Sequence, residues 1–465
     1  MNNIAELVRA RLTEELLSVN ERDEIMEPLV EPARFNRVQI ITGMRRSGKT
    51  FYLFQQMHKL IERGVLRKHI FYFDFSDDRL PLVGNVMDEV LDEYWRQVPT
   101  ARTEGCYLFL DEVQDCEGWQ ATCRRVAETE KVTLTITGSS SKVSSDEIAT
   151  TFRGRSHSHE MLPLSFTEFV RFHPARVPET LRFGDFAGDC GRAFSSSERT
   201  ALESLFDDYL VVGGFPAVQA DSESTRVEIL QGYVRDVVAR DVAERLSRPS
   251  IPLANQVALL ILRTTARELS VNGICETLRA SGYKIGWERA QELCTLFRQA
   301  YLYFELWEYS RQPLAKSTNP PKSYAVDPGL AYAVSRASQQ DVGLRLETAV
   351  YLELRRRMAG RRTDSISSYT DLGARHQKLD FLVGEEYAGG LEPPAPYALY
   401  QVSLSLASEK TRRRELSSLA AAMARTGIGE GTVVTLRESE DVRLDTGIVH
   451  VVPAWRWFLE LEQHT

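Results

Sequence analysis

Residues 38–50 place the pattern G-x-x-x-x-G-K-T directly after a short apolar run. Gly43 and Gly48 permit backbone angles closed to other residues, so successive N–H groups can turn toward phosphate oxygens. Lys49 offers a positive charge to the β- and γ-phosphates, and the Thr50 hydroxyl suits a Mg²⁺ ion. We therefore predict a nucleotide-phosphate loop made of Gly43, Met44, Arg45, Arg46, Ser47, Gly48, Lys49 and Thr50.

A second apolar run, residues 106–110, ends in Asp111 and Glu112. A strand buried on both faces of a parallel sheet has such a continuous run, and ligands gather at the carboxyl ends of these strands. We expect Asp111 to lie beside Thr50 and to help hold Mg²⁺, and Glu112 to orient or deprotonate an attacking water. A strand with an acidic cap is the alternative.

Polar residues also follow a third apolar run, residues 132–136. Thr137, Ser139 or Ser140 could contact both the γ-phosphate and the attacking water, although a turn rich in small residues would look the same. Arg155, with Arg153 as second choice, is the candidate for neutralising charge in the transition state, from its own subunit or from a neighbour. The alternative for both is an arginine that is solvated or ion-paired.

Strands and helices alternate across this part of the chain. Strands are expected at 38–43, 70–75, 106–111 and 132–140, with helices at about 50–63 and 86–96 between them. This alternation predicts a doubly wound α/β sheet. Residues 1 to about 35 carry an amphipathic helix pattern that Pro28 and Pro32 interrupt.

Composition indicates an ordinary globular protein of several domains. The chain has 465 residues, of which 43% are hydrophobic and 26% charged, and its net charge of -8 argues against a protein that coats nucleic acid. The six cysteines have no metal-binding spacing, and no apolar run is long enough for a membrane helix. We expect a cytoplasmic protein with no membrane partner.

These motifs together resemble a large prokaryotic family of AAA-type ATPases, in which an origin-recognition-like core precedes a C-terminal domain of unknown function. The resemblance rests most on the arginine pair Arg45-Arg46 in the loop and on the block Pro163-Leu164-Ser165-Phe166-Thr167-Glu168-Phe169. It also includes Gly213-Gly214-Phe215-Pro216 and extends to residues 233–242. It implies ATP rather than GTP as the nucleotide.

Residues 251–335 contain helix patterns followed by two strand patterns, which resembles a winged helix-turn-helix. DNA reading is one hypothesis. The expected recognition helix, however, offers only one basic residue among Trp287, Glu288, Arg289, Gln291 and Glu292. A packing or protein-contact role is therefore the favoured interpretation.

The last part of the chain resembles a restriction-endonuclease-like core. Glu347 lies in a helix pattern, Asp380 in a strand pattern, and Gln401 starts the Gln-x-Ser of the next strand. A nuclease of this kind uses carboxylates to bind Mg²⁺ and a lysine to position water. Because Gln401-Val402-Ser403 stands where Glu-x-Lys is expected, we predict a degenerate site that has lost cleavage, with Lys378 as a conceivable substitute for the lysine.

The sequence thus predicts an α/β protein with a P-loop AAA-type ATPase core, a helical lid, a winged helix and a nuclease-like domain. We expect an ATP-hydrolysing, Mg²⁺-dependent switch whose nucleotide state repositions the C-terminal region, with a DNA or protein partner and a homo-oligomer as further expectations. The alternative is a nucleic-acid-binding protein or nuclease regulated by ATP. The expected domains are a helical lead-in at 1–35, the core at 36–170, the lid at 171–250, the winged helix at 251–335 and the nuclease-like domain at 336–465.

Overall fold

The computed structural model describes residues 3–81, 84–139, 151–152, 154–179, 193–247, 250–310, 319–335, 341–358, 364–371, 377–385 and 395–460. The chain divides into two compact units. Unit 1 comprises Met1–Leu162 together with the short segment Gln299–Tyr301, and unit 2 comprises Pro163–Arg298 and Leu302–Thr465.

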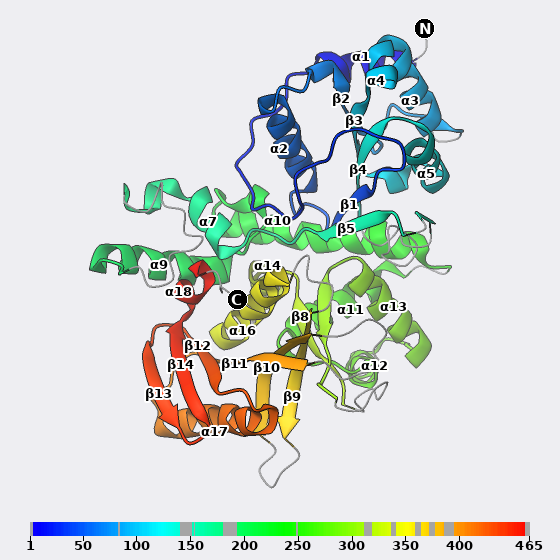
Figure 1. Ribbon diagram of the computed structural model, residues 1–465. Coiled ribbons are helices and arrows are strands. Elements are labelled where there is room, and N and C mark those ends of the chain that lie inside the picture. The colour runs from blue at the N-terminus through cyan, green and yellow to red at the C-terminus, as the bar shows by residue number, and fades with distance from the viewer. Residues whose placement is uncertain are drawn as a thin grey trace. The chain divides into compact units, whose positions relative to one another are not determined.

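A five-stranded parallel sheet forms the centre of unit 1, in the order β2-β3-β4-β1-β5 (Figure 1). Its strands are β1 (Val38–Gly43), β2 (Ile70–Asp74), β3 (Cys106–Asp111), β4 (Val132–Ser139) and β5 (Ser156–Glu160). Every residue of β3 is buried, as a central strand covered on both faces requires. Because all five strands are parallel, their carboxyl ends share one edge of the sheet.

Helices cover both faces of this sheet (Figure 1). One apolar cluster joins the sheet to α1 (Asn3–Thr13), α3 (Val86–Gln97), α4 (Pro99–Glu104) and α5 (Trp119–Thr129). A second cluster joins its other face to α2 (Lys49–Glu62). The predicted α/β class with a parallel sheet is confirmed.

The N-terminal segment differs from the sequence prediction, because its helix ends at Thr13 rather than continuing toward residue 35. Beyond it, Glu24 accepts hydrogen bonds from Tyr52, Gln55 and Gln56 of α2. Tertiary contacts therefore hold this segment in an extended form along α2, and its helical periodicity is overridden.

Unit 2 begins with a helical region and a small antiparallel sheet. Its first helices are α7 (Phe166–Phe172), α9 (Ser196–Val212), α10 (Glu223–Asp236), α11 (Ile251–Arg263), α12 (Val271–Ala280) and α13 (Trp287–Gln299). The small sheet has the order β6-β8-β7, with β6 (Arg267–Glu268), β7 (Tyr303–Leu306) and β8 (Lys322–Ala325). Within the region expected to form a helical lid, α10 is followed directly by a π-helical segment at Val237–Val242.

Two motifs of the family resemblance have structural explanations within unit 2. In the Pro-Leu-Ser-Phe block, Ser165 and Glu168 form a capping box at the start of α7, which satisfies two otherwise unpaired backbone N–H groups. In the Gly-Gly-Phe-Pro motif, the Gly214 N–H donates to Asp327 at 2.6 Å. A side chain at Gly213 would place its Cβ 2.1 Å from the same carboxylate, so this approach requires glycine.

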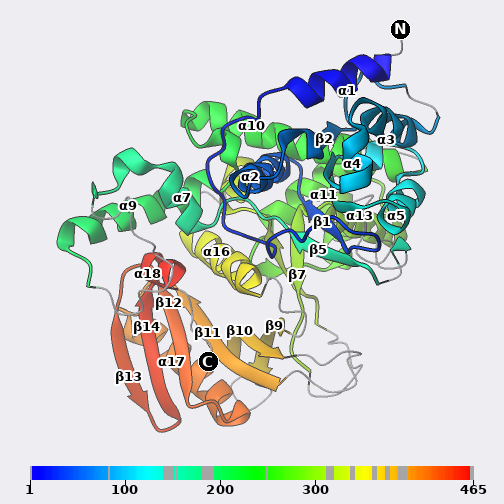
Figure 2. The same cartoon turned by 45° about the horizontal axis from the view of Figure 1, so that its top comes forward.

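The C-terminal part of unit 2 is a six-stranded mixed sheet in the order β13-β14-β12-β11-β10-β9. Its strands are β9 (Asp364–Asp371), β10 (Gln377–Glu385), β11 (Ala395–Ser403), β12 (Glu430–Thr435), β13 (Glu440–Leu444) and β14 (Gly447–Pro453). Helix α17 (Glu409–Thr426) packs its apolar side on one face of this sheet (Figure 2). The remaining helices are α14 (Pro328–Val334), α16 (Val342–Arg357) and α18 (Ala454–Leu459).

Candidate functional site

The glycine-bounded loop leaves β1 at Gly43 and enters α2 at Lys49. Gly48 has φ +107°, and a Cβ on Gly43 would lie 2.2 Å from the carbonyl oxygen of Met161, so both positions require glycine. The Lys49 ammonium donates to the carbonyls of Gly43 and Met44 at 3.0 and 3.2 Å. The loop therefore folds around the lysine and presents the unpaired N–H groups of the α2 start.

The other predicted loop residues take different positions. Met44 and Ser47 are buried, Arg45 is half-buried, and Arg46 is exposed with a left-handed φ of 68°. Among the described residues, the Ser47 Oγ is buried without a hydrogen-bond partner. A buried hydroxyl in a phosphate loop can donate to a ligand oxygen without losing a protein contact.

Asp111, at the end of β3, meets Thr50 of α2. The Thr50 hydroxyl donates to one carboxylate oxygen at 2.7 Å, and the Tyr72 hydroxyl donates to the same oxygen at 3.0 Å. The Thr137 hydroxyl donates to the other oxygen. Tyr72 was missed by sequence reasoning, although an inward-facing tyrosine on the neighbouring strand was the available signal.

Burial controls the charge state of this carboxyl group. Removal from water, with the nearby charge of Glu112, raises the pKa of Asp111 to about 6, although the hydroxyls of Thr137 and Thr50 oppose this. Asp111 therefore changes charge just below neutral pH.

Glu112 has φ 49°, an uncommon left-handed backbone for a residue with a side chain. Its N–H donates to the Thr137 hydroxyl at 3.1 Å, and its carboxylate accepts from the Gln114 amide at 2.6 Å. Two neighbours thus fix the acid at the strand edge. Unusual backbone angles concentrate at functional sites.

The structure adds Arg22, which sequence reasoning did not single out. Its buried guanidinium donates to the carbonyls of Ser47 at 2.9 Å and Leu162 at 3.0 Å. It therefore joins the phosphate loop to the last residue of unit 1's main segment. No sequence motif marks this arginine, because its partners are backbone carbonyls.

Among the candidates at the end of β4, Thr137 lies between Asp111 and Glu112. The side chain of Ser139 and the whole of Ser140 lie outside the described residues, as does Arg153.

Arg155 lies far from the phosphate loop. Its carbonyl accepts from the N–H of Val38, the first residue of β1, and Ser156 pairs with Val38 in the parallel register. The loop follows the opposite end of β1, about 17 Å away at 3.3 Å per residue. The prediction that Arg155 acts on phosphates of its own subunit is therefore wrong. Its guanidinium instead lies over the Phe35 ring, 5.0 Å from the centroid.

Residues 251–335, which resemble a winged helix in sequence, place the expected recognition surface on α13. Trp287 at the start of α13 is exposed, but Arg289 forms an ion pair with Glu292 at 2.7 Å. Arg289, the basic residue among the five expected at this surface, is thus ion-paired within its own helix.

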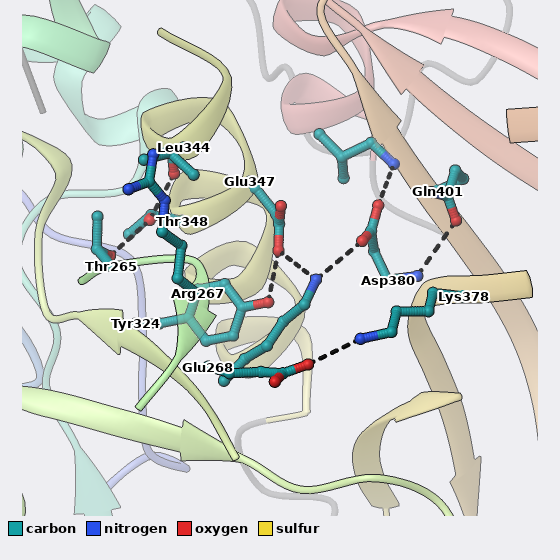
Figure 3. Close-up of polar contacts among 12 residues, drawn as sticks. Thr265, Arg267, Glu268, Tyr324, Leu344, Glu347, Thr348, Lys378, Asp380 and Gln401 are labelled. Atoms are coloured by element: carbon teal, nitrogen blue, oxygen red, sulfur yellow. Dashed lines mark hydrogen bonds and ion pairs between the residues drawn. The ribbon is translucent and has the colours of Figure 1, made fainter. Parts of the chain in front are cut away.

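A separate polar pocket of about 550 Å³ lies in unit 2 and contains all three predicted nuclease-like residues. Figure 3 shows Glu347 of α16 and Asp380 of β10 facing each other, with Gln401 of β11 beyond Asp380. Lys378 turns away to Glu268, at 2.7 Å, so its expected role as a substitute is not supported (Figure 3). The cation that contacts both acids is Lys322, which sequence reasoning missed.

Comparison with protein families identifies the class of the first domain. Residues 35–170 match the family model of an AAA domain, and residues 203–341 match that of a domain of unknown function, DUF8612. Together with the loop and sheet geometry, this shows an AAA-family P-loop ATPase domain followed by DUF8612.

Two curated relatives cover most of the chain. An uncharacterized protein of Methanocaldococcus jannaschii is 29% identical over 431 residues, covering 91% of this chain and 88% of that protein. An uncharacterized protein of Haemophilus influenzae is 25% identical over 338 residues, covering 72% of this chain and 78% of that protein.

Solved structures show more distant similarity. The Walker-type ATPase of Pyrococcus abyssi has a TM-score of 0.41 at 14% identity, covering 64% of this chain and 91% of that chain. The Orc1 protein of Aeropyrum pernix, solved with DNA, has a TM-score of 0.28 at 15% identity, covering 73% and 90%. Within the described residues, no helix combines the length and the hydrophobicity that a bilayer crossing demands.

Proposed function

We propose that residues 36–170 bind ATP with Mg²⁺ and hydrolyse it. The observation that carries this proposal is the 2.7 Å contact between Thr50 and Asp111, which joins the start of α2 to the end of β3 beside the glycine-bounded loop. This convergence supports a magnesium-nucleotide site because the hydroxyl, the carboxylate and the loop amides come from three separate segments of the chain.

The donor set fits the metal and the triphosphate. Thr50 and Asp111 would hold Mg²⁺, which usually keeps several waters and needs few protein ligands. The ion would neutralise charge on the phosphate oxygens. The buried Ser47 hydroxyl and the amides of the loop would bind the phosphates themselves.

Lys49, Glu112 and Thr137 would each have a separate role in the reaction. Lys49 would exchange its two loop carbonyls for phosphate oxygens, which are stronger acceptors for an ammonium. Glu112, fixed by its own backbone and by Gln114, would orient the attacking water or accept its proton. Thr137 would hold the Asp111 carboxylate against the backbone of Glu112, since its hydroxyl contacts that carboxylate and the Glu112 N–H.

We further propose that nucleotide state is transmitted to unit 2 as a molecular switch. Arg22 supports this role because one guanidinium contacts both Ser47 and Leu162, and the chain enters unit 2 at Pro163. A change in loop position on ATP binding would strain or release that pair of hydrogen bonds. The Leu162 end of the connection would then respond to the nucleotide.

The test is phosphate release by the full chain and two variants. Lys49→Ala should abolish hydrolysis, and Glu112→Gln should bind ATP but release phosphate at least a hundredfold more slowly, because a positioned base typically contributes 10²–10⁴-fold. Parental rates in both variants would refute the site assignment. For the switch, Arg22→Gln should retain hydrolysis while losing ATP-dependent changes in hydrogen exchange at residues 163–172.

The alternative, a nucleic-acid-binding protein or nuclease regulated by ATP, makes a different prediction. It requires cleavage of plasmid or single-stranded DNA with Mg²⁺ or Mn²⁺ that is lost in Asp380→Ala. The charges around Asp380 do not favour this alternative, since the Lys322 ammonium already pairs with the acid at 3.0 Å. The same geometry supports a separate inference.

A further inference from the structure

Glu347 and Asp380 share one cation, the ammonium of Lys322. The ammonium lies 2.9 Å from Glu347 Oε1 and 3.0 Å from Asp380 Oδ1. All three side chains are largely buried, with 19%, 15% and 12% of their surfaces exposed for the lysine, the glutamate and the aspartate. The three residues come from three separate elements, β8, α16 and β10.

Each acid also accepts a hydrogen bond from a neutral donor. The Tyr324 hydroxyl donates to Glu347 Oε1 at 2.8 Å, and the backbone N–H of Val402 donates to Asp380 Oδ2 at 3.0 Å (Figure 3). Both acids therefore accept one neutral hydrogen bond and one charged one. This geometry is specific rather than an accidental approach of flexible surface chains.

Two buried carboxylates so close together require a positive charge. The two carboxylate oxygens both lie within 3.0 Å of the Lys322 nitrogen, so their like charges are close to each other and repel in this buried setting. Burial and the charge of Asp380 raise the pKa of Glu347, and the two acids raise the pKa of Lys322 despite its burial. The ammonium thus keeps its proton at neutral pH.

Gln401 does not alter this charge balance. Its carbonyl oxygen accepts from the Asp380 N–H at 3.2 Å, and its amide donates to Glu415 at 2.7 Å. Both ends of this neutral side chain are therefore used in holding β10, β11 and α17 together. Across the described residues, no group of three or more acids, histidines or cysteines is arranged to hold a metal ion.

We propose that the Glu347–Asp380 pair is a cation site whose resident cation is the Lys322 ammonium in place of a divalent metal. The lysine offsets one negative charge of the pair and occupies the position between the two carboxylates that a metal would need. The domain therefore binds no metal at this pair and cleaves no nucleic acid there. Removing the ammonium while keeping the side-chain bulk opens the pair to Mg²⁺ or Mn²⁺.

The ion pair of Lys322 with Asp380 also connects two sheets of unit 2. Lys322 belongs to the small sheet of the winged-helix-like region, whereas Asp380 belongs to the six-stranded sheet. A buried ion pair between two sheets fixes their relative position, and breaking such a pair by removing one partner is strongly destabilising. The ion pair between Lys322 and Asp380 thus fixes the small sheet against the six-stranded sheet inside unit 2.

The experiment measures Mn²⁺ binding by electron paramagnetic resonance in the nucleotide-free full chain. All proteins carry Asp111→Asn, which removes the other expected metal ligand. Lys322→Met should bind one equivalent of Mn²⁺ at least tenfold more tightly than its parent, and adding Asp380→Asn should abolish the gain. Lys378→Met is the matched control, because this lysine lines the same pocket but pairs with Glu268, and it should gain no site.

A folded Lys322→Met protein that gains no Mn²⁺ would overturn the proposal. If that variant does not fold, the parent decides the matter: Mn²⁺ binding or DNA cleavage that disappears in Asp380→Asn would refute a lysine-filled site, and equal, negligible binding in both would support it. ATP hydrolysis is measured separately, in chains that retain Asp111, so failure here is distinguishable from failure of the ATPase proposal.

Discussion

Replacing Asp111 with asparagine should stabilise nucleotide-free unit 1 at neutral pH while disabling its proposed metal site. The carboxyl group is almost fully buried, and its pKa is raised from an ordinary 3.8 to about 6. Because the folded pKa is raised, this group's contribution to stability is present at low pH and is lost as pH rises through about 6. Asparagine has no such titration.

The magnitude follows from the two pKa values. Their difference corresponds to about 3 kcal/mol of free energy of unfolding. Most of it develops between pH 4 and pH 7. The stability of Asp111→Asn relative to the parent should therefore rise by about 2–3 kcal/mol across this window. Any constant offset from altered hydrogen bonds to Thr50, Tyr72 and Thr137 does not affect this change with pH.

Hydrogen exchange of peptides from β1, β3 and β4 measures this difference. Parent and variant are compared at the same pH, so intrinsic exchange rates cancel. Asp92→Asn, the same substitution at an exposed position of α3, is the control and should show no pH-dependent difference. A difference between Asp111→Asn and its parent that stays constant from pH 4 to pH 7 would refute the reasoning about the buried carboxyl.

Three further predictions concern other parts of unit 1. Gly43→Ala should lose ATP binding measured by calorimetry, because its Cβ would lie 2.2 Å from the Met161 carbonyl, and retained affinity would show that the loop tolerates this displacement. Tyr72→Phe should cost about 1–3 kcal/mol in hydrogen-exchange stability by removing one donor to Asp111, with an unchanged value speaking against that contact. Arg155→Ala should not change phosphate release in dilute protein, since this residue lies at the other end of β1, and a loss only at high protein concentration would indicate action on a neighbouring subunit.

The proposed nucleotide site of unit 1 could be predicted from the sequence because local patterns encode its parts. Glycines frame the loop, and an apolar run marks β3, so the meeting of Thr50 with Asp111 follows from parallel topology. Arg155 was misplaced because proximity along the chain does not reveal which end of a strand a residue precedes. Arg22 was missed because its backbone partners leave no pattern in the sequence.

The acidic pocket of unit 2 could be predicted from the sequence only in part. Glu347, Asp380 and Gln401 were identified from a resemblance to a restriction-endonuclease-like core, and the structure brings them to one pocket. Lys322 lies 25 residues before Glu347 and 58 before Asp380, in a strand assigned to another region. Only the packing of two sheets shows that this lysine, rather than Lys378, contacts the acids.

Equilibrium binding of ATP by Glu112→Gln and Lys49→Ala, each with Mg²⁺ and with EDTA, tests the central claim most directly. We predict tight, Mg²⁺-dependent retention of intact ATP by Glu112→Gln and at least a hundredfold weaker binding by Lys49→Ala, because a charged hydrogen-bond pair of about 3 kcal/mol is lost. Equal affinity of the two variants for ATP, unaffected by EDTA, would contradict a site built from the loop, Thr50 and Asp111.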